Sequence, residues 1–213
     1  MEKEIRSLVE APQISNDGNT LEGFAAVYNS PSQDLGGFTE IIRPGAFDRA
    51  LASGNDVVAR FNHHPDSILG RTSNNTLRLW SDSRGLRYSV KLDDTTDAVD
   101  LKKKIKRGDI SGSSFEFRTA PKGDSWRKDN GKVIRELRDV DIFDVGPVIN
   151  PAYKATSTSV RSIEELNKQE QEEAAKVVTE QKAQEEKLAA EQLSTYVETL
   201  KLKQKQFEIE ASI

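Results

Sequence analysis

The amino-acid composition changes abruptly near residue 161, and this change limits what the chain can fold into. Residues 162–213 contain 12 glutamates, 7 lysines and no glycine or proline. Glutamate, lysine, glutamine and alanine favour helices, and the residues that usually break a helix are missing. The sequence therefore predicts two domains: residues 1–161, and a helical extension, in part coiled-coil-like, at residues 162–213.

The predicted extension carries signals for its start and for a contact surface. Ser162 and Glu165 have the spacing of a capping box, which favours a helix start. Farther along, four residues recur at a spacing that places them on one stripe of a helix: Ala189, Leu193, Tyr196 and Leu200. Two interpretations stay open. The helix folds back on its own domain or frays in water, or the stripe binds another protein or a second copy of the chain.

Residues 1–161 have the pattern of a β-rich domain. Runs of β-branched and aromatic residues alternate with clusters of Gly, Asn and Asp, which is typical of short strands joined by turns. Seven such runs favour a barrel or sandwich, and they lie at residues 21–28, 57–62, 76–80, 85–92, 110–117, 133–137 and 140–149. Two helices are predicted between them, at 45–52 after Pro44 and at 96–107, where Gly108 ends the second.

Composition excludes several classes of function. The formal charge of −4 gives no indication of a nucleic-acid or anionic-membrane partner. The chain has no cysteine, so disulfides, thiol nucleophiles and thiolate metal sites are excluded, and a nucleophile must be oxygen or nitrogen. The first residues do not form a signal peptide, and no segment has the eighteen or so apolar residues of a membrane span.

The two histidines of the chain, His63 and His64, follow the strand-like run at 57–62. Side chains alternate along a strand, so His63 is predicted to end the apolar face that carries Ala59 and Phe61. A histidine at the edge of a buried face has the restricted water access that suits a general base. A structural histidine remains an alternative, while the spacing disfavours a metal site.

A serine-rich run at 108–118, GDISGSSFEFR, follows the predicted second helix. Alternation places Ser114 on a polar face, opposite the face of Ser113, Phe115 and Phe117. Serines in strands are often inert, and the GxSxG elbow of α/β-hydrolases is absent. Spacing alone does not assign a role to Ser114.

A third run, at 138–153, alternates apolar and acidic residues before a turn at Asn150 and Pro151. Asp144 lies within it between Phe143 and Val145. An unpaired carboxylate is costly to bury, so Asp144 needs a partner. Two partners stay open: His63, or one of the many arginines.

Taken in order, these runs resemble the prohead protease family of tailed phages, whose members trim capsid and scaffold proteins during head maturation. The resemblance rests on five motifs between about residues 20 and 160: EIIRPGAF at 40–47, Asn62-His63 with Gly70, Gly85-Leu86, ISGSSFEF at 110–117, and DVGPVINPA at 144–152. The chain departs from the family pattern at Asp144, where glutamate is common, and at Gly146, where serine is frequent.

The resemblance implies a fold and a chemistry. The implied fold is mainly β, a small antiparallel barrel wrapped by helices as in herpesvirus assembly proteases. The implied activity is that of a serine endopeptidase without a cofactor, in which Ser114 is the nucleophile, His63 the base and Asp144 the group that orients His63. The implied substrates are major capsid and scaffold proteins, cut in the host cytoplasm inside the assembling prohead.

Two other hypotheses compete with the peptidase. In one, the chain is a non-catalytic scaffolding protein that organises capsid subunits through its C-terminal helix. In the other, it is a β-rich binding module unrelated to peptidases, which predicts that His63 and Ser114 lie far apart.

Overall fold

The computed structural model describes residues 2–151 and 157–210. The chain divides into two compact units, Met1–Ile163 and Glu164–Ile213. The division lies close to the predicted boundary at 161, whose meaning as a functional boundary stays a prediction. Each unit is described by itself below.

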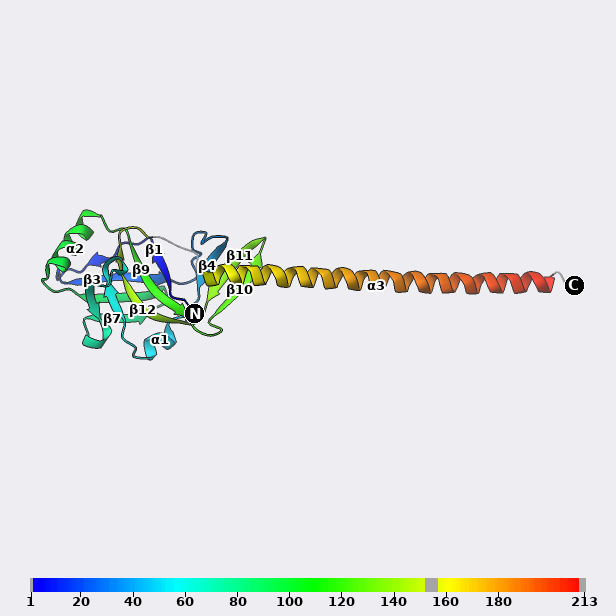
Figure 1. The fold of residues 1–213 in the computed structure, drawn as a ribbon, viewed down its shortest axis with the longest axis horizontal. Helices are drawn as coiled ribbons and strands as arrows, with labels where there is room; N and C mark the ends of the chain where they lie inside the picture. The colour runs from blue at the N-terminus through cyan, green and yellow to red at the C-terminus, as the bar shows by residue number, and fades with distance from the viewer. Residues whose placement is uncertain (1, 152–156, 211–213) are drawn as a thin grey trace. The chain divides into compact units, whose positions relative to one another are not determined.

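Within residues 2–151, twelve strands form three sheets, and Figure 1 labels most of these strands. The five-stranded sheet has, in spatial order, β1 (Glu4–Leu8), β9 (Gly112–Thr119), β12 (Val140–Val148), β5 (Val58–Arg60) and β6 (Ile68–Arg71). The four-stranded sheet consists of β2 (Gln13–Ile14), β3 (Thr20–Val27), β8 (Gly85–Lys91) and β7 (Leu77–Ser81). The three-stranded sheet consists of β10 (Asp124–Asp129), β11 (Lys132–Leu137) and β4 (Phe38–Ile42).

The predicted fold is confirmed in part: the sheets and the long C-terminal helix are present, but a closed antiparallel barrel is not found in the described residues. Within residues 2–151 and 157–210 the fold is a mixed α/β arrangement of three separate sheets, and no closed barrel is found. Two strand pairs, β12 with β5 and β11 with β4, are parallel. Strands β1 and β6 are the two edge strands of the five-stranded sheet and do not pair with each other, so this sheet does not close on itself.

All seven predicted runs overlap observed strands, but five strands were not predicted: β1, β2, β4, β6 and β10. Strand β1 shows why. Its inward positions carry Glu4 and Arg6, which are buried, so the apolar half of the expected alternation is missing from the sequence. Strand β4 likewise buries Glu40.

Short helices lie at the positions predicted for them. Helix α1 spans Asp48–Ala52 and so starts three residues later than predicted, whereas α2 spans Thr96–Arg107, its predicted bounds. The Oγ1 of Thr95 accepts a hydrogen bond of 3.4 Å from the N–H of Ala98, and Gly108 ends the helix with a left-handed φ of 83°. The lysines of its last turn complement the helix dipole, as predicted.

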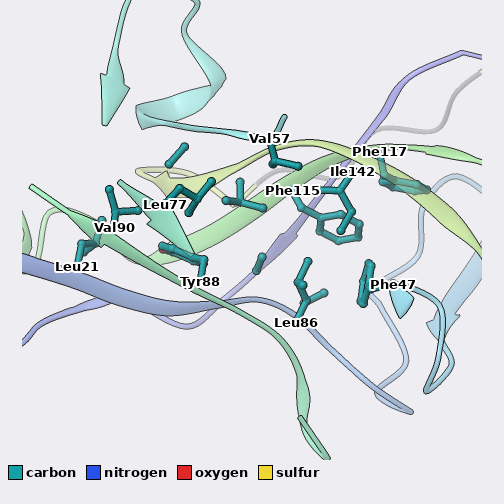
Figure 2. Packing of buried hydrophobic residues seen from close by; sticks show 14 of the residues in the cluster. Leu21, Phe47, Val57, Leu77, Leu86, Tyr88, Val90, Phe115, Phe117 and Ile142 are labelled. Carbon is teal, nitrogen blue, oxygen red and sulfur yellow. The ribbon is translucent and has the colours of Figure 1, made fainter. Parts of the chain in front are cut away.

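The hydrophobic core contains side chains from both larger sheets (Figure 2). Phe115 and Phe117 of β9 stack with ring centroids 4.9 Å apart, and Phe47 meets Phe115 edge-on at 5.6 Å. Tyr88 of β8 is fully buried and belongs to the same cluster. Because Phe115 and Phe117 point into this core, the alternation of β9 directs Ser114 to the opposite face of the sheet.

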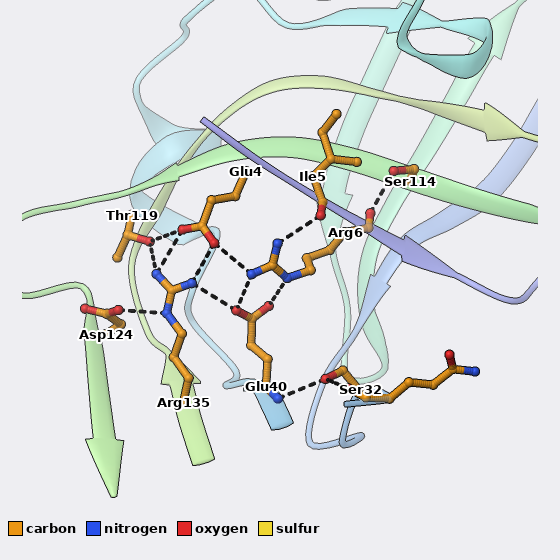
Figure 3. Close-up of polar contacts among 10 residues, drawn as sticks. Glu4, Ile5, Arg6, Ser32, Glu40, Ser114, Thr119, Asp124 and Arg135 are labelled. Atoms are coloured by element: carbon orange, nitrogen blue, oxygen red, sulfur yellow. Dashed lines mark hydrogen bonds and ion pairs between the residues drawn. The ribbon is translucent and has the colours of Figure 1, made fainter. Parts of the chain in front are cut away.

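A cluster of four buried charges joins β1 to the three-stranded sheet (Figure 3). Arg6 of β1 contacts Glu40 of β4 at 2.8 Å and Glu4 at 2.7 Å. Arg135 of β11 contacts Glu4 at 2.7 Å and Glu40 at 3.1 Å. All four side chains are at most 3% exposed, so each relies on its neighbours for its countercharge.

Helix α3 spans Ser157–Glu210. The long C-terminal helix predicted from composition is thereby confirmed. The predicted stripe of Ala189, Leu193, Tyr196 and Leu200 lies outside the described side chains. No helix in the described part of the chain is long and apolar enough to cross a membrane.

The charge cluster generates a test of stability. Replacing Arg135 with alanine leaves Glu4 and Glu40 short of a cation in a buried site, so we expect the free energy of unfolding to fall by about 3–5 kcal/mol. Trp126 lies 5.3 Å from the Arg135 guanidinium, and its fluorescence in a urea titration reports the transition. Arg138→Ala is the matched control, because that side chain is 60% exposed. A loss below about 1 kcal/mol, the value of a surface pair, would contradict the account.

Candidate active site

His63 lies in a tight turn directly after β5. The strand ends at Arg60, and the 3₁₀ turn Phe61–His63 follows. Asn62 and His63 both have left-handed φ angles, 53° and 56°, a conformation that asparagine tolerates better than most residues. The Oδ1 of Asn62 accepts a 2.9 Å hydrogen bond from the N–H of Ile149, which ties the turn to the end of β12.

This turn corrects the predicted position of His63. The alternation of a strand does not extend to residue 63, so His63 does not end an apolar strand face. Two consecutive left-handed residues turn the ring toward β9 instead. The His63 side chain is 13% exposed, so water has the restricted access to it that was expected of a general base. The turn, and not a strand face, produces this burial.

Ser114 lies in the middle of β9, between β1 and β12. Its Cα is opposite Ser7 on one side and Gly146 on the other. The predicted faces are confirmed: Ser113 points inward, where its hydroxyl lies 2.9 Å from that of Tyr88, and Ser114 points the other way. Ser114 is fully buried.

Asp144 lies on β12 on the same face as Ser114. A β-bulge between Ile142 and Asp144 shifts the register, so Asp144 is opposite Glu116, two residues from Ser114 along β9. Its carboxylate is buried, and both partners left open by the sequence are present. The Oδ2 of Asp144 lies 3.4 Å from the Nδ1 of His63 and 3.2 Å from the Nη1 of Arg60.

The structure brings the three predicted site residues together. The Nε2 of His63 lies 2.7 Å from the Oγ of Ser114, and the opposite ring nitrogen faces Asp144. This is the order hydroxyl, imidazole, carboxylate, in which one ring nitrogen can exchange a proton with the hydroxyl while the other faces a negative charge. The contact contradicts the hypothesis of an unrelated binding module, which required His63 and Ser114 to lie far apart.

Strand β1 supplies two further neighbours of the Ser114 hydroxyl. The Oγ of Ser114 donates a hydrogen bond of 2.8 Å to the carbonyl oxygen of Arg6, a contact visible in Figure 3. The Oγ of Ser114 in turn accepts a hydrogen bond of 3.2 Å from the Oγ of Ser7. A hydroxyl has one hydrogen, and a carbonyl oxygen only accepts. While Ser114 donates to Arg6, the 2.7 Å contact therefore needs a hydrogen on the Nε2 of His63.

The buried charge cluster holds β1 in this position. Burial opposes ionisation of Glu4, but hydrogen bonds and charges from Arg135 and Arg6 outweigh it and lower the pKa of Glu4. Burial raises the pKa of the fully enclosed Glu40, although both arginines oppose the change. Strand β1 is thus anchored by Arg6, whose backbone carbonyl contacts the Ser114 hydroxyl.

A cleft of about 330 Å³ opens beside the site. His63 and Ser7 line it together with uncharged side chains from β1, the His63 turn and the end of β12: Ile5, Asn62, Val148, Ile149 and Asn150. An extended segment of another chain would meet His63 and Ser7 here before it met Ser114. In the described part of the chain, no group of three or more His, Cys, Asp or Glu side chains is placed to hold a metal ion.

Sequence reasoning missed three contributors to the site: Arg60, Arg6 and Ser7. Arg60 carried a weak signal, because it lies in the strand that leads to His63 and the chain offered arginines as partners for Asp144. Arg6 and Ser7 carried none, since β1 itself was not predicted.

Comparisons with known proteins agree with the motifs. Residues 6–169 match the family described as Caudovirus prohead serine protease. The chain is 31% identical over 162 residues to the prohead protease of Enterobacteria phage HK97, covering 72% of this chain and 68% of that protein. Among solved structures, the capsid assembly protease of bacteriophage T4 matches at 11% identity with a TM-score of 0.46, covering 71% of this chain and 100% of that one. The family match includes all three predicted site residues, and we conclude that this chain belongs to the Caudovirus prohead serine protease family.

Proposed function

We propose that the chain is the endopeptidase that cuts major capsid and scaffold proteins during prohead maturation, with Ser114 as nucleophile, His63 as base and Asp144 as the group that orients His63. One observation carries the assignment of residues. The 2.7 Å contact between the Nε2 of His63 and the Oγ of Ser114 joins residues 51 positions apart in the chain, beside a buried carboxylate. Family membership supports the reaction class.

The proposed reaction is acyl transfer in two steps. The Nε2 of His63 takes the Ser114 proton as the Oγ attacks the scissile carbonyl carbon. The same nitrogen then gives that proton to the leaving amine as the C–N bond breaks. Water, activated by His63 in the same way, attacks the resulting ester and releases Ser114. Asp144 stays ionised and stabilises the imidazolium that forms in each step.

Two rearrangements precede attack in this scheme. The Ser114 hydrogen turns from the carbonyl of Arg6 toward the Nε2 of His63, which requires that nitrogen to be unprotonated. The Ser114 hydroxyl is also fully buried, so the side chains of the cleft move apart to admit a peptide bond. The hydroxyl of Ser7 donates to the Oγ of Ser114 and helps to hold that oxygen in place for attack.

The helical extension has a proposed role in recruitment. A maturation protease acts inside the assembling head, so it has to be enclosed with its substrates before it cuts them. Helix α3 carries exposed apolar side chains among charged ones, including Val177, Val178 and Leu188, which suit contact with a scaffold or capsid protein. We propose that α3 binds one of these proteins or a second copy of itself, within the host cell.

The nucleophile is tested by co-expression of the full chain with the capsid and scaffold proteins of its own phage. We expect fragments with the unaltered chain and none with Ser114→Ala, because no other group replaces the attacking oxygen. Intact-mass measurement identifies the cut sites. Ser125→Ala on β10 is the matched control and is expected to cut normally. Equal fragments from Ser114→Ala would reject Ser114 as the nucleophile, and no fragments from any form in assembled proheads would favour the scaffolding hypothesis.

Recruitment is tested by deleting residues 162–213. If the extension only delivers the protease, the shortened chain still cuts a peptide that spans a mapped site, but less of it is found in purified proheads. Quantitative immunoblotting of proheads against the capsid protein gives the ratio. Unchanged incorporation would remove the recruitment role, and loss of peptide cleavage would show that the extension supports the catalytic unit itself.

A further inference from the structure

The carboxylate of Asp144 has a second cationic neighbour that the proposed mechanism does not use. Its Oδ2 lies 3.2 Å from the Nη1 of Arg60 and 3.4 Å from the Nδ1 of His63, so both groups face the same oxygen. The Nη1 of Arg60 donates a hydrogen bond to this oxygen, whereas the Nδ1 of His63 has no hydrogen-bond partner among the described residues. Of these two neighbours, it is Arg60 that makes the hydrogen bond to this oxygen.

The pairing of β5 with β12 brings Arg60 to Asp144. The parallel pairing of the two strands ends at Val145 and Ala59, one residue before Arg60. At the next position of β12 a Cβ built on Gly146 would lie 2.1 Å from the carbonyl oxygen of Arg60, where no side chain fits. Glycine at 146 is the residue that permits this approach.

The local charges show why Asp144 needs Arg60. Asp144 is buried, and its Oδ1 has no hydrogen-bond partner in the described part of the chain. The residue opposite it on β9 is a second carboxylate, Glu116, whose charge is met by Lys3 at 3.0 Å rather than shared with Asp144. A buried carboxylate beside a like charge is costly without a cation, and Arg60 is the ion-pair partner present before His63 gains a proton.

We propose that Arg60 is a positioning residue of the protease, which holds the Asp144 carboxylate toward the Nδ1 of His63, and that Gly146 is required because it lets Arg60 reach this place. The inference rests on the proposed roles of Ser114, His63 and Asp144. It also links the two departures from the family pattern. A short aspartate is held by an arginine from β5, and the side chain at 146 is removed to make room for that strand.

A double-mutant cycle separates positioning from general support of the fold. The four proteins are the full-length chain, Arg60→Met, Asp144→Asn and the double variant, and kcat and KM are measured on a peptide spanning a mapped cleavage site. Arg60→Met is expected to lower kcat by about 10- to 100-fold, the effect of one charge-assisted hydrogen bond, with little change in KM. Arg60→Lys, which keeps a cation, is expected to recover part of the loss.

The decisive comparison is the effect of Arg60→Met in the two backgrounds. If Arg60 acts through Asp144, the substitution changes kcat by less than about twofold once residue 144 is asparagine. The same 10- to 100-fold loss in both backgrounds, or unaltered kcat in Arg60→Met, would overturn the proposal. Unaltered kcat in Asp144→Asn would overturn it as well.

Two controls keep the result interpretable. Arg71→Met removes an exposed arginine from neighbouring β6, where it pairs with Asp56, and is expected to leave kcat unchanged. If Arg60→Met does not fold, two other comparisons of kcat replace it. Arg60→Lys is compared with the unaltered chain, and the double variant Arg60→Met with Asp144→Asn is compared with Asp144→Asn alone. A loss of kcat in the first comparison and a change below about twofold in the second support the proposal. Failure of the proposed function itself is recognised separately, because Ser114→Ala would then still cleave, or the unaltered chain would not cleave at all.

Discussion

The site depends on the position of β9 between β1 and β12. This pairing places Ser114 opposite Ser7 and Gly146, and it directs Phe115 and Phe117 into the core on the other face. The core thus fixes the direction of the Ser114 side chain, and its two neighbouring strands supply the groups that touch it. The buried charge cluster completes the arrangement, because Arg6 ties β1 to Glu40 while its carbonyl oxygen receives the Ser114 hydrogen bond.

The sequence predicted the parts whose stability is local. Helix α2 has its own cap at Thr95 and its own stop at Gly108, and the long helix follows from composition alone, so both were found. Strand β1 was missed because its inward residues are Glu4 and Arg6, whose charges are met in part by Glu40 and Arg135, far along the chain. The closed antiparallel barrel that the resemblance implied is not found in the described residues. The strand runs could not correct this expectation, because they carry no information about their partners, and here two of the pairings are parallel.

In the candidate site, too, local features could be predicted from the sequence and contacts between distant segments could not. The resemblance pointed to His63, Ser114 and Asp144, but not to the geometry that joins them. The left-handed turn at Asn62 and His63 interrupts the alternation on which the predicted face of His63 relied. For Asp144, burial required a partner without selecting one, and the structure places both His63 and Arg60 against the same oxygen. The periodicity of a single sequence indicates which residues share a face of a strand, but it does not predict contacts between separate strands.

Covalent labelling tests the central claim, that His63 activates Ser114, most directly. The full-length chain is treated with a fluorophosphonate, which reacts with activated serines, and the modified residue is located by peptide mass spectrometry. The account predicts a single label on Ser114, with labelling lost in His63→Ala. Labelling is retained in His64→Ala, because the ring of His64 accepts a hydrogen bond from the N–H of Asp66 and has no part in the proposed mechanism. Labelling of another serine, or equal labelling of Ser114 in His63→Ala, would contradict it.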